Sequence, residues 1–395
     1  MANRGPWPML GGNAQHTGLA PVSLDLNSVS VKWNALSEIQ HSVGWISPAI
    51  GEDGTIYAGD GDGVMALDSS GKLKWRVWIH RYPTSWSWSP GIGSGGNIHV
   101  GSAYGLVTIS NTGQFVWNFT TATPVKCPPT VDDEGRVYFG QYYGPPDAQY
   151  YLYCVLPNGT LAWRHEFGPV GISSPAIGYD GIVYAVGAVN SSYDSPYRLA
   201  AFNPNGTLLW EFDLNSSVSS SPVVTEDTIY IGCDNARFYA IGTNGSLKWV
   251  FEATAGIKTT AAIAADGTIY FGSDDGCLYS LSKNGFLNWA IPSGILDYTQ
   301  PVIGMDGTVL FGNQSGLVAV SPNGTVKWHL DLETWVYSPA IGEDGTIYVG
   351  TWQRGLIAIG PASGVGLEWY VLGVSIGIAI VIAVAFAIVR WKRSK

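Results

Sequence analysis

Few residues of this sequence combine the types and spacing that metal binding requires. No Cys-x-x-Cys pair occurs, so a zinc site is not expected. Cys154 occupies a position that recurs along the chain and elsewhere holds Ala or Ser. Small buried thiols are therefore favoured over disulfides. The four cysteines are Cys127, Cys154, Cys233 and Cys277.

Acidic residues and a histidine could in principle serve acid–base chemistry or calcium binding. Five aspartates each precede a Gly in what reads as one repeated hairpin turn: Asp53, Asp180, Asp266, Asp306 and Asp344. Asp is a turn former, so a structural role is the simpler interpretation. His16 has no acidic or Ser partner nearby in the sequence, which favours a turn residue or a polar lid over catalysis. We predict no catalytic, cofactor-binding or metal-binding residue.

Aromatic and basic residues form the better candidate for a binding surface. Most of them directly precede a recurring Ser-Pro element, and Trp352 stands outside the tryptophan period described below. An aromatic rim with a few cations can bind a sugar, a peptide or a flat ring. The alternative is that these rings only pack on each other and plug a channel mouth. The candidates are Trp45, Trp86, Trp88, Lys126, Lys258, Tyr298, Trp335, Tyr337 and Trp352.

Charge excludes one class of partner. The chain has 20 Lys and Arg against 30 Asp and Glu, a net charge of −10. Nucleic-acid binding needs a basic footprint, so it is not expected. Solubility alone accounts for the acidity.

The elements that must position these residues follow from a repeat of tryptophans. Successive intervals, by subtraction, are 42, 42, 46, 47, 39, 40 and 39 residues. A period of about 40–45 residues built from short strands is typical of β-propeller blades. The eight tryptophans, which we expect to dock neighbouring blades, are Trp33, Trp75, Trp117, Trp163, Trp210, Trp249, Trp289 and Trp328.

Each repeat predicts four short antiparallel strands separated by glycine-containing turns. In the unit that ends at Trp328, we expect strands near 301–303, 308–311, 317–320 and 325–330. The unit after it lacks a fourth strand, and the residues around Trp33 supply a fourth strand with nothing before it. Joining the two closes an eight-bladed, all-β ring and pairs otherwise exposed edges. A rival, in which Trp369 closes the last blade, would orphan Trp33.

The turns of such a ring lie on two faces. Turns between the first and second and between the third and fourth strands are short and uniform, and we call their side the repetitive face. The opposite side, the irregular face, carries the long insertions at 141–151 and 187–198 and the aromatic connection at 78–88. The candidate aromatic and basic residues are expected there.

These motifs resemble the pyrroloquinoline-quinone-like propeller repeat family. The resemblance rests on the Asn-Gly-x-Leu-x-Trp end of the blade, the Ser-Pro-Ala-Ile-Gly-x-Asp-Gly-Thr-Ile-Tyr run, and the opening from Trp7 to Gly18. It covers about residues 7–360, and it implies the fold more strongly than the function.

The resemblance implies two alternative activities. One branch of the family comprises quinone-dependent dehydrogenases, which hold the quinone with calcium beneath a vicinal disulfide. No two cysteines are adjacent here and no matching insertion occurs, so pyrroloquinoline quinone with calcium is an unfavoured alternative. The other branch comprises non-enzymatic surface and assembly-factor propellers, to which we assign this chain.

A membrane anchor is predicted at the C-terminus. Residues 371–389 carry no charge and would span roughly 28 Å as a helix, close to the thickness of a bilayer core. Trp369 and Trp391 flank it and residues 390–395 are basic, which predicts a cytoplasmic tail and an outside propeller. Gly373 and Gly377 form a Gly-x-x-x-Gly motif that hints at a weak dimer. Residues 1–28 are an opening segment, 29–360 the propeller and 361–370 a juxtamembrane linker.

Glycosylation motifs support the outside location, although Met1 to Pro6 does not read as a signal sequence. Either the true start lies upstream, or the protein is tail-anchored with its propeller inside. Eight Asn-x-Ser/Thr motifs occur, four of them in one blade turn where Asn-Gly has a structural cause. They are Asn118, Asn158, Asn190, Asn205, Asn215, Asn244, Asn313 and Asn323.

The sequence thus predicts a single-pass, membrane-anchored propeller scaffold that binds a protein or small ligand through its irregular face. A quinone-dependent dehydrogenase and a carbohydrate-binding surface module are the alternatives.

Overall fold

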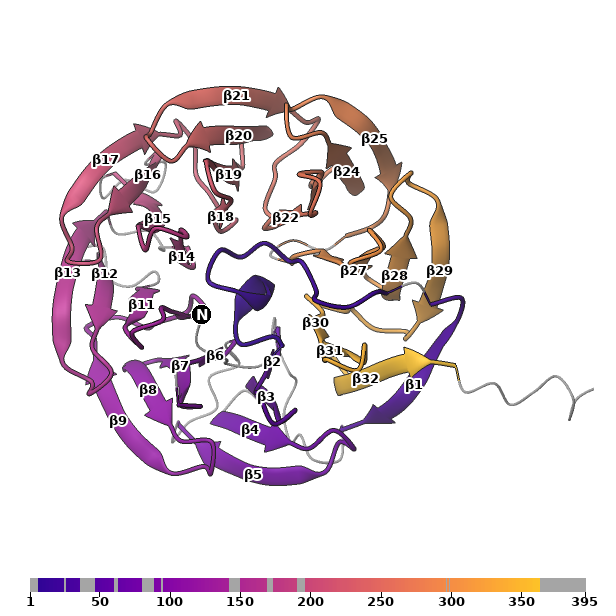
Figure 1. The fold of residues 1–395 in the computed structure, drawn as a ribbon, viewed down its shortest axis with the longest axis horizontal. Helices are drawn as coiled ribbons and strands as arrows, with labels where there is room; N and C mark the ends of the chain where they lie inside the picture. Colours follow the sequence, from indigo (N-terminus) through magenta and orange to yellow (C-terminus); the bar gives the residue numbers. More distant parts are fainter. Residues whose placement is uncertain are drawn as a thin grey trace, which may run out of the picture.

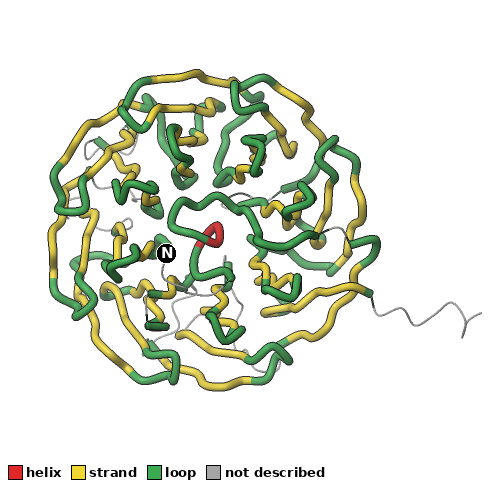
Figure 2. The backbone as a smooth tube through the Cα atoms, viewed as in Figure 1, coloured by secondary structure: helices red, strands yellow, loops and turns green. Residues whose placement is uncertain are grey.

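The computed structural model describes residues 6–24, 26–35, 47–59, 63–79, 89–93, 95–141, 150–168, 173–189, 196–295, 297 and 299–362. Within these ranges the chain forms eight four-stranded antiparallel sheets arranged in a ring (Figure 1). Strands and turns make up nearly all of the backbone, with one helical turn, η1 (Leu10–Gly12), near the centre (Figure 2). The prediction of an all-β, eight-bladed propeller with four-stranded blades is confirmed.

The strands follow the chain from the axis outward in each of blades 1 to 7. Blade 1 is β2 (Ala49–Ile50), β3 (Ile56–Gly59), β4 (Gly63–Leu67) and β5 (Leu73–Trp78); blade 2 is β6 (Gly91–Ile92), β7 (Ile98–Ser102), β8 (Gly105–Ile109) and β9 (Phe115–Thr120); blade 3 is β10 (Thr130–Val131), β11 (Val137–Gly140), β12 (Tyr150–Val155) and β13 (Leu161–Phe167); blade 4 is β14 (Ala176–Ile177), β15 (Val183–Ala188), β16 (Tyr197–Phe202) and β17 (Leu208–Asp213).

The remaining blades follow the same order. Blade 5 is β18 (Val223–Val224), β19 (Thr228–Gly232), β20 (Arg237–Gly242) and β21 (Leu247–Glu252); blade 6 is β22 (Ala262–Ile263), β23 (Ile269–Gly272), β24 (Cys277–Leu281) and β25 (Leu287–Pro292); blade 7 is β26 (Val302–Ile303), β27 (Val309–Gly312), β28 (Gly316–Val320) and β29 (Val326–Asp331); blade 8 is β30 (Ala340–Ile341), β31 (Ile347–Thr351), β32 (Gly355–Pro361) and β1 (Val29–Asn34).

Blade 8 closes the ring with strands from both ends of the chain. β1 pairs antiparallel with β32, with Val29 opposite Pro361 and Asn34 opposite Ile357. The outer edge of β32 is therefore covered by the chain's own N-terminal strand, so the seam leaves no unpaired edge there. Trp33 lies in this strand, as the sequence predicts, and Trp369 is not needed for closure.

Burial separates the inner strands from the outer ones. β3 and β4 are buried at every position, because neighbouring blades pack on both of their faces. The outer β21 instead alternates between exposed and half-buried side chains, since it forms the edge of the ring. One core cluster joins Ala66 of blade 1 to Ile98 and Val100 of blade 2. Such interblade contacts bury apolar surface around the whole ring.

The cysteines follow the expectation from the sequence. All four are free thiols; Cys127, Cys154 and Cys233 are buried and Cys277 is half-buried. Burial raises the pKa of the Cys127 thiol to about 12, which keeps it protonated and unreactive at neutral pH.

No helix in the described ranges is long and apolar enough to cross a membrane. The predicted span at 371–389, the Gly373/Gly377 motif and the basic tail lie outside the described residues.

Candidate functional site

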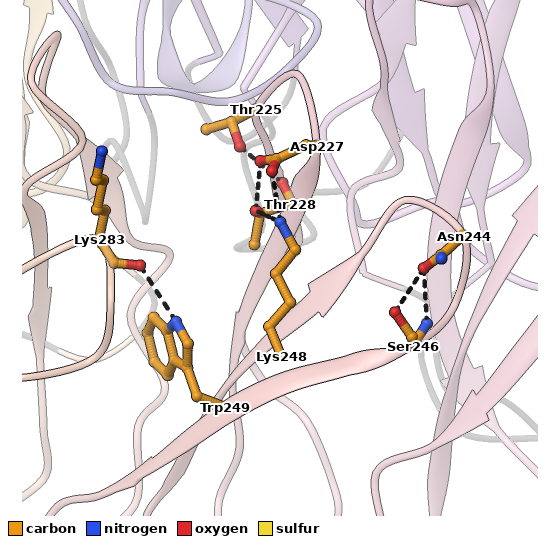
Figure 3. A network of polar contacts seen from close by, with 8 residues as sticks. All are labelled: Thr225, Asp227, Thr228, Asn244, Ser246, Lys248, Trp249 and Lys283. Atoms are coloured by element: carbon orange, nitrogen blue, oxygen red, sulfur yellow. Dashed lines mark hydrogen bonds and ion pairs between the residues drawn. The ribbon is translucent and has the colours of Figure 1, made fainter.

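Each of the eight periodic tryptophans links its blade to the next. The indole Nε1 of Trp249 donates to the carbonyl of Lys283 at 3.2 Å (Figure 3). Six other indoles likewise donate to a backbone carbonyl in the turn between the third and fourth strands of the following blade, at 2.8–3.0 Å. Trp328 of blade 7 donates to the carbonyl of Leu26 at 2.9 Å, just before β1 of blade 8. The tryptophans therefore join the blades in one continuous circle on the repetitive face.

Seven of the eight indoles lie over a turn that requires glycine; the exception is Trp328, which donates to Leu26. Gly206 has φ 88°, and a Cβ atom built on it would lie 2.6 Å from Cγ of Trp163. A larger residue would be strained by this backbone and would also clash with the ring. Both constraints explain why Asn-Gly or its equivalent recurs in this turn.

The repeated aspartates act as turn acceptors. Asp53 Oδ1 accepts from the amide of Thr55 at 3.0 Å, and Asp344 and Thr346 repeat the contact at 2.9 Å. Such side-chain caps hold the hairpin at its tip. The simpler interpretation of these residues, as turn formers, matches this geometry.

Four blades add a lysine to this turn that the sequence reading missed. Lys248, the residue before Trp249, donates to Asp227 Oδ2 at 2.6 Å and to Thr228 Oγ1 at 2.7 Å (Figure 3). The lysine lowers the pKa of the Asp227 carboxyl. The sequence carried a signal for this contact: Lys precedes the periodic Trp in four of the five blades whose turn has a Thr after the acid, and blade 6 has Asn288 instead. The lysines are Lys32, Lys74, Lys248 and Lys327.

The axis of the ring is filled by the N-terminal segment. Residues 6–24 cross the centre of the ring in Figure 1. Backbone amides at the ends of the first strands donate in turn to its carbonyls at 2.7–2.9 Å. The pairs are Ile50 to Trp7, Ile92 to Pro8, Ile177 to Ala14, Val224 to Gln15, Ile263 to Thr17 and Ile303 to Gly18. Six blades thus bind the segment in chain order, and we call residues 6–24 the axial plug.

His16 anchors the centre of the axial plug. Its side chain is fully buried, with Nδ1 3.2 Å from the Pro222 carbonyl of blade 5 and Nε2 3.2 Å from Thr130 Oγ1 of blade 3. Desolvation lowers the pKa of His16 to about 4. The imidazole is therefore neutral at pH 7, and its Nδ1 donates to the Pro222 carbonyl, which can only accept. The sequence predicts either a turn residue or a polar lid at His16, and this arrangement corresponds to the lid.

Gln300 is a second anchor that sequence reasoning missed. Its Nε2 donates to the carbonyls of His16 at 2.6 Å and Ala261 at 2.9 Å. Most other blades carry Ser before the proline of the first strand, as in Ser47-Pro48 and Ser338-Pro339. Gln at this one position departs from the repeat, and that departure was the available signal.

The axial plug leaves no cradle for a planar cofactor at this end of the axis. A quinone there would displace residues 14–18, whose carbonyls already accept bonds from four blades. In the ranges that the structure describes, no three His, Cys, Asp or Glu side chains are grouped to hold a metal ion. The axial residues of this end therefore do not fit a quinone–calcium site.

Two of the candidate aromatic residues come together on the irregular face. The rings of Trp335 and Trp352 lie 6.0 Å apart between centroids at an interplanar angle of 40°. They remain 45% and 42% exposed. The Trp352 amide donates to the Trp335 carbonyl at 3.0 Å, and Arg354 pairs with Glu333 at 2.6 Å. This tryptophan pair is thus exposed to solvent and held on both sides.

The candidate cations lie in other blades. Lys258, in the connection from blade 5 to blade 6, pairs with Asp274 at 2.7 Å and Asp297 at 3.5 Å. Desolvation and the neighbouring Asp274 raise the pKa of the Asp297 carboxyl. Lys126 precedes blade 3 and is half-buried, and desolvation lowers its pKa. Tyr337 is buried beneath blade 8.

The remaining candidates divide by whether the structure describes them. Trp45, Trp86, Trp88 and Tyr298 lie outside the described residues, as does Asn190. Among the other glycosylation motifs, Asn313 is half-buried and its Nδ2 donates to the Ser293 carbonyl at 3.2 Å. The rest have exposed asparagines: Asn118, Asn158, Asn205, Asn215, Asn244 and Asn323.

A closed ring of eight blades, docked by tryptophans and with one end of its axis filled, defines the class: an eight-bladed β-propeller. Residues 64–143 and 148–365 match the family described as outer membrane protein assembly factor BamB, and the chain belongs to that family. No curated protein sequence is significantly similar to the chain.

Solved structures show the same fold at low sequence identity. BamB from Moraxella catarrhalis is 15% identical with a TM-score of 0.65, over 85% of this chain and 98% of that one. The quinohemoprotein alcohol dehydrogenase from Comamonas testosteroni is 13% identical with a TM-score of 0.72, over 91% and 81%. The computationally designed Ika8 protein is 12% identical with a TM-score of 0.67, over 81% and 97%. An assembly factor, an enzyme and a designed chain thus share this fold.

Proposed function

We propose that this chain is a membrane-anchored, non-catalytic scaffold that binds a protein partner through the irregular face of its propeller. The tryptophan pair of Trp335 and Trp352 is the observation that carries the proposal. Exposed, pre-positioned indoles are the side chains that most often dominate protein interfaces. Because the two rings already pack against each other, less side-chain entropy is lost when a partner binds.

Family membership supports a protein partner rather than a substrate. The matched family is described as an assembly factor of outer membrane proteins. The axial plug adds to this support, since it fills one end of the axis, where a ring-shaped fold can enclose a small molecule. The surface of the ring then remains for recognition.

Anchoring and an outside location rest on the sequence. Residues 371–389 are apolar along their whole length and are followed by a basic tail. Six glycosylation motifs place their asparagine on the exposed surface of the described residues. Asn313 is the exception, and we expect it to stay unmodified because its amide nitrogen is engaged.

The test is a comparison of two variants of the full-length chain, each recovered from its native membrane with bound proteins quantified by mass spectrometry. Trp335→Ala with Trp352→Ala removes the exposed pair on the irregular face. Phe286→Ala with Leu287→Ala removes a matched area of exposed apolar surface on the repetitive face. We expect partners to be lost at least tenfold with the first variant and retained with the second. Equal recovery with both would contradict the proposal.

An exposed indole pair also suits a carbohydrate ligand, because sugar rings stack on aromatic faces. A glycan array probed with the parent chain and with Trp335→Ala and Trp86→Ala variants separates this function from protein binding. Binding by the parent that is lost in the variants would replace the protein partner with a glycan.

A quinone-dependent dehydrogenase is the competing enzyme. Titration of the purified chain with pyrroloquinoline quinone and calcium should give no saturable binding. Saturable binding together with dye-linked alcohol oxidation would overturn the non-catalytic assignment.

A further inference from the structure

The repetitive face carries an unusual circle of apolar side chains. The residue two positions before each periodic tryptophan begins, or nearly begins, the outer strand of its blade. In six successive blades it is apolar and 40–62% exposed: Phe115, Leu161, Leu208, Leu247, Leu287 and Val326. Val31 and Leu73 hold the same position in blades 8 and 1. We call these eight residues the apolar belt.

Further exposed apolar residues reinforce the same face. Phe286 and Met305 are 71% and 72% exposed, and Tyr179 is 57% exposed; all three lie in turns of the repetitive face. Soluble surfaces usually scatter such residues singly, whereas a circle around one face marks an interaction site. Because the belt repeats with the blades, its members hold equivalent positions in successive outer strands around the ring. A flat partner fits this arrangement better than a convex one.

The course of the chain points to the identity of that partner. β32 begins at Gly355 in a turn of the irregular face and ends at Pro361 on the repetitive face, opposite Val29 of β1. Nine residues, 362–370, separate this point from the predicted span. Nine residues of any conformation reach at most about 30 Å. A membrane span at 371–389, as the sequence predicts, would therefore enter the bilayer close to the face that carries the apolar belt.

Several charges on the repetitive face are neutralised in pairs. Lys248 pairs with Asp227 at 2.6 Å, Lys74 with Asp53 at 3.2 Å, and Arg136 with Asp132 at 2.6 Å. Paired charges lower the cost of bringing a surface against a lipid headgroup layer. Phe and Leu side chains between them suit the boundary between headgroups and acyl chains.

We propose that the repetitive face rests on the lipid bilayer, with the apolar belt in its interfacial layer and the irregular face turned away. This inference rests on the membrane anchor of the proposed function. It gives the two faces separate tasks: the belt and the span fix the orientation of the ring, and the tryptophan pair is presented to partners.

The test places a fluorophore on either face of the full-length chain in phosphatidylcholine vesicles that contain nitroxide-labelled lipid. Phe286→Cys and Val326→Cys report on the belt side, and Tyr104→Cys and Trp352→Cys report on the irregular face. Cys277→Ser is the background, because the other three thiols are buried. All four label sites are at least 42% exposed, so the fold should tolerate them, which thermal unfolding checks.

We expect lipid quenching at 286 and 326 to exceed that at 104 and 352 at least threefold. Replacing Phe115, Leu247 and Leu287 with Ser should reduce this ratio toward one. Equal or reversed quenching in vesicles that retain the protein would overturn the orientation while leaving the anchor intact. Failure of the protein to float with vesicles would overturn the anchor and the orientation together. Weak quenching at all four sites with concentration-dependent dimerisation would assign the belt to a second copy of the chain.

Discussion

The two faces of this propeller differ in how they are built. On the repetitive face, the same turn chemistry recurs in blade after blade: an aspartate cap, a glycine beneath an indole and, in four blades, a lysine clamp. The irregular face is built from connections that differ between blades, and only there does an indole pair such as Trp335 and Trp352 lie exposed among the described residues. The contrast teaches that repetition supplies closure and stability, while its interruptions supply the candidate binding surface.

Acid should have the largest effect on stability, and it should act through His16 of the axial plug. The folded pKa is lowered from 6.5 to about 4, so between these values the unfolded chain binds more protons than the folded one. Stability is therefore lost as pH falls from 6.5 toward 4, by about 3 kcal/mol for a shift of this size. Urea unfolding across pH 4–7 measures the slope. His16→Gln should flatten it, whereas His329→Gln, an exposed control, should leave it unchanged.

Removing one docking indole should have the next largest effect. Trp163→Ala deletes a half-buried ring and its 2.9 Å bond to the Pro204 carbonyl. We expect a loss of about 2–3 kcal/mol, toward the low end for buried aromatics because the ring is half-buried. Chemical denaturation of the variant measures it. A loss no larger than that of Trp352→Ala would erase the distinction between structural and surface tryptophans.

The lysine clamp should matter less. Lys248→Met removes exposed contacts to Asp227 and Thr228, and such pairs contribute roughly 0.2–1 kcal/mol. The difference from the parent should shrink in 1 M salt, because exposed ion pairs are screened. A salt-independent loss would indicate that the lysine stem, rather than its charge, stabilises the turn.

Removing the tryptophan pair should hardly change the stability of the fold. Trp335→Ala and Trp352→Ala should shift the free energy of unfolding by about 0.5 kcal/mol or less, as exposed substitutions usually do. We expect these substitutions to weaken partner binding instead. A large loss of stability in these variants would assign the pair to the structure of blade 8 and weaken its proposed function.

The sequence predicts the fold well because each blade repeats its own local signals. Asp-Gly and Asn-Gly turns bound the strands, and the orphaned strand around Trp33 specifies ring closure, which β1 and β32 realise. The strand bounds of blade 7 agree with the structure within one residue at each end.

The sites are less predictable because they depend on contacts between blades. Lys258 meets Asp274 and Asp297 from two different connections, and no spacing in the sequence indicates that meeting. The axial plug is harder still to predict from the sequence, since residues 6–24 do not repeat and bind six blades that lie far apart in the chain. Trp335 and Trp352 could each be singled out as aromatics outside the period, but their contact follows only from the pairing of their loops.

The central claim is that the axial plug closes one end of the propeller and leaves the irregular face for recognition. Hydrogen–deuterium exchange on the full-length chain tests it most directly, in peptides that cover the amides of Ile50, Ile92, Ile177, Val224, Ile263 and Ile303, which bond to the plug. We predict that these amides and residues 7–24 exchange as slowly as the buried strands β3 and β4. If these amides and residues 7–24 exchanged within seconds while β3 and β4 stayed protected, the axis would be open and the claim would be contradicted.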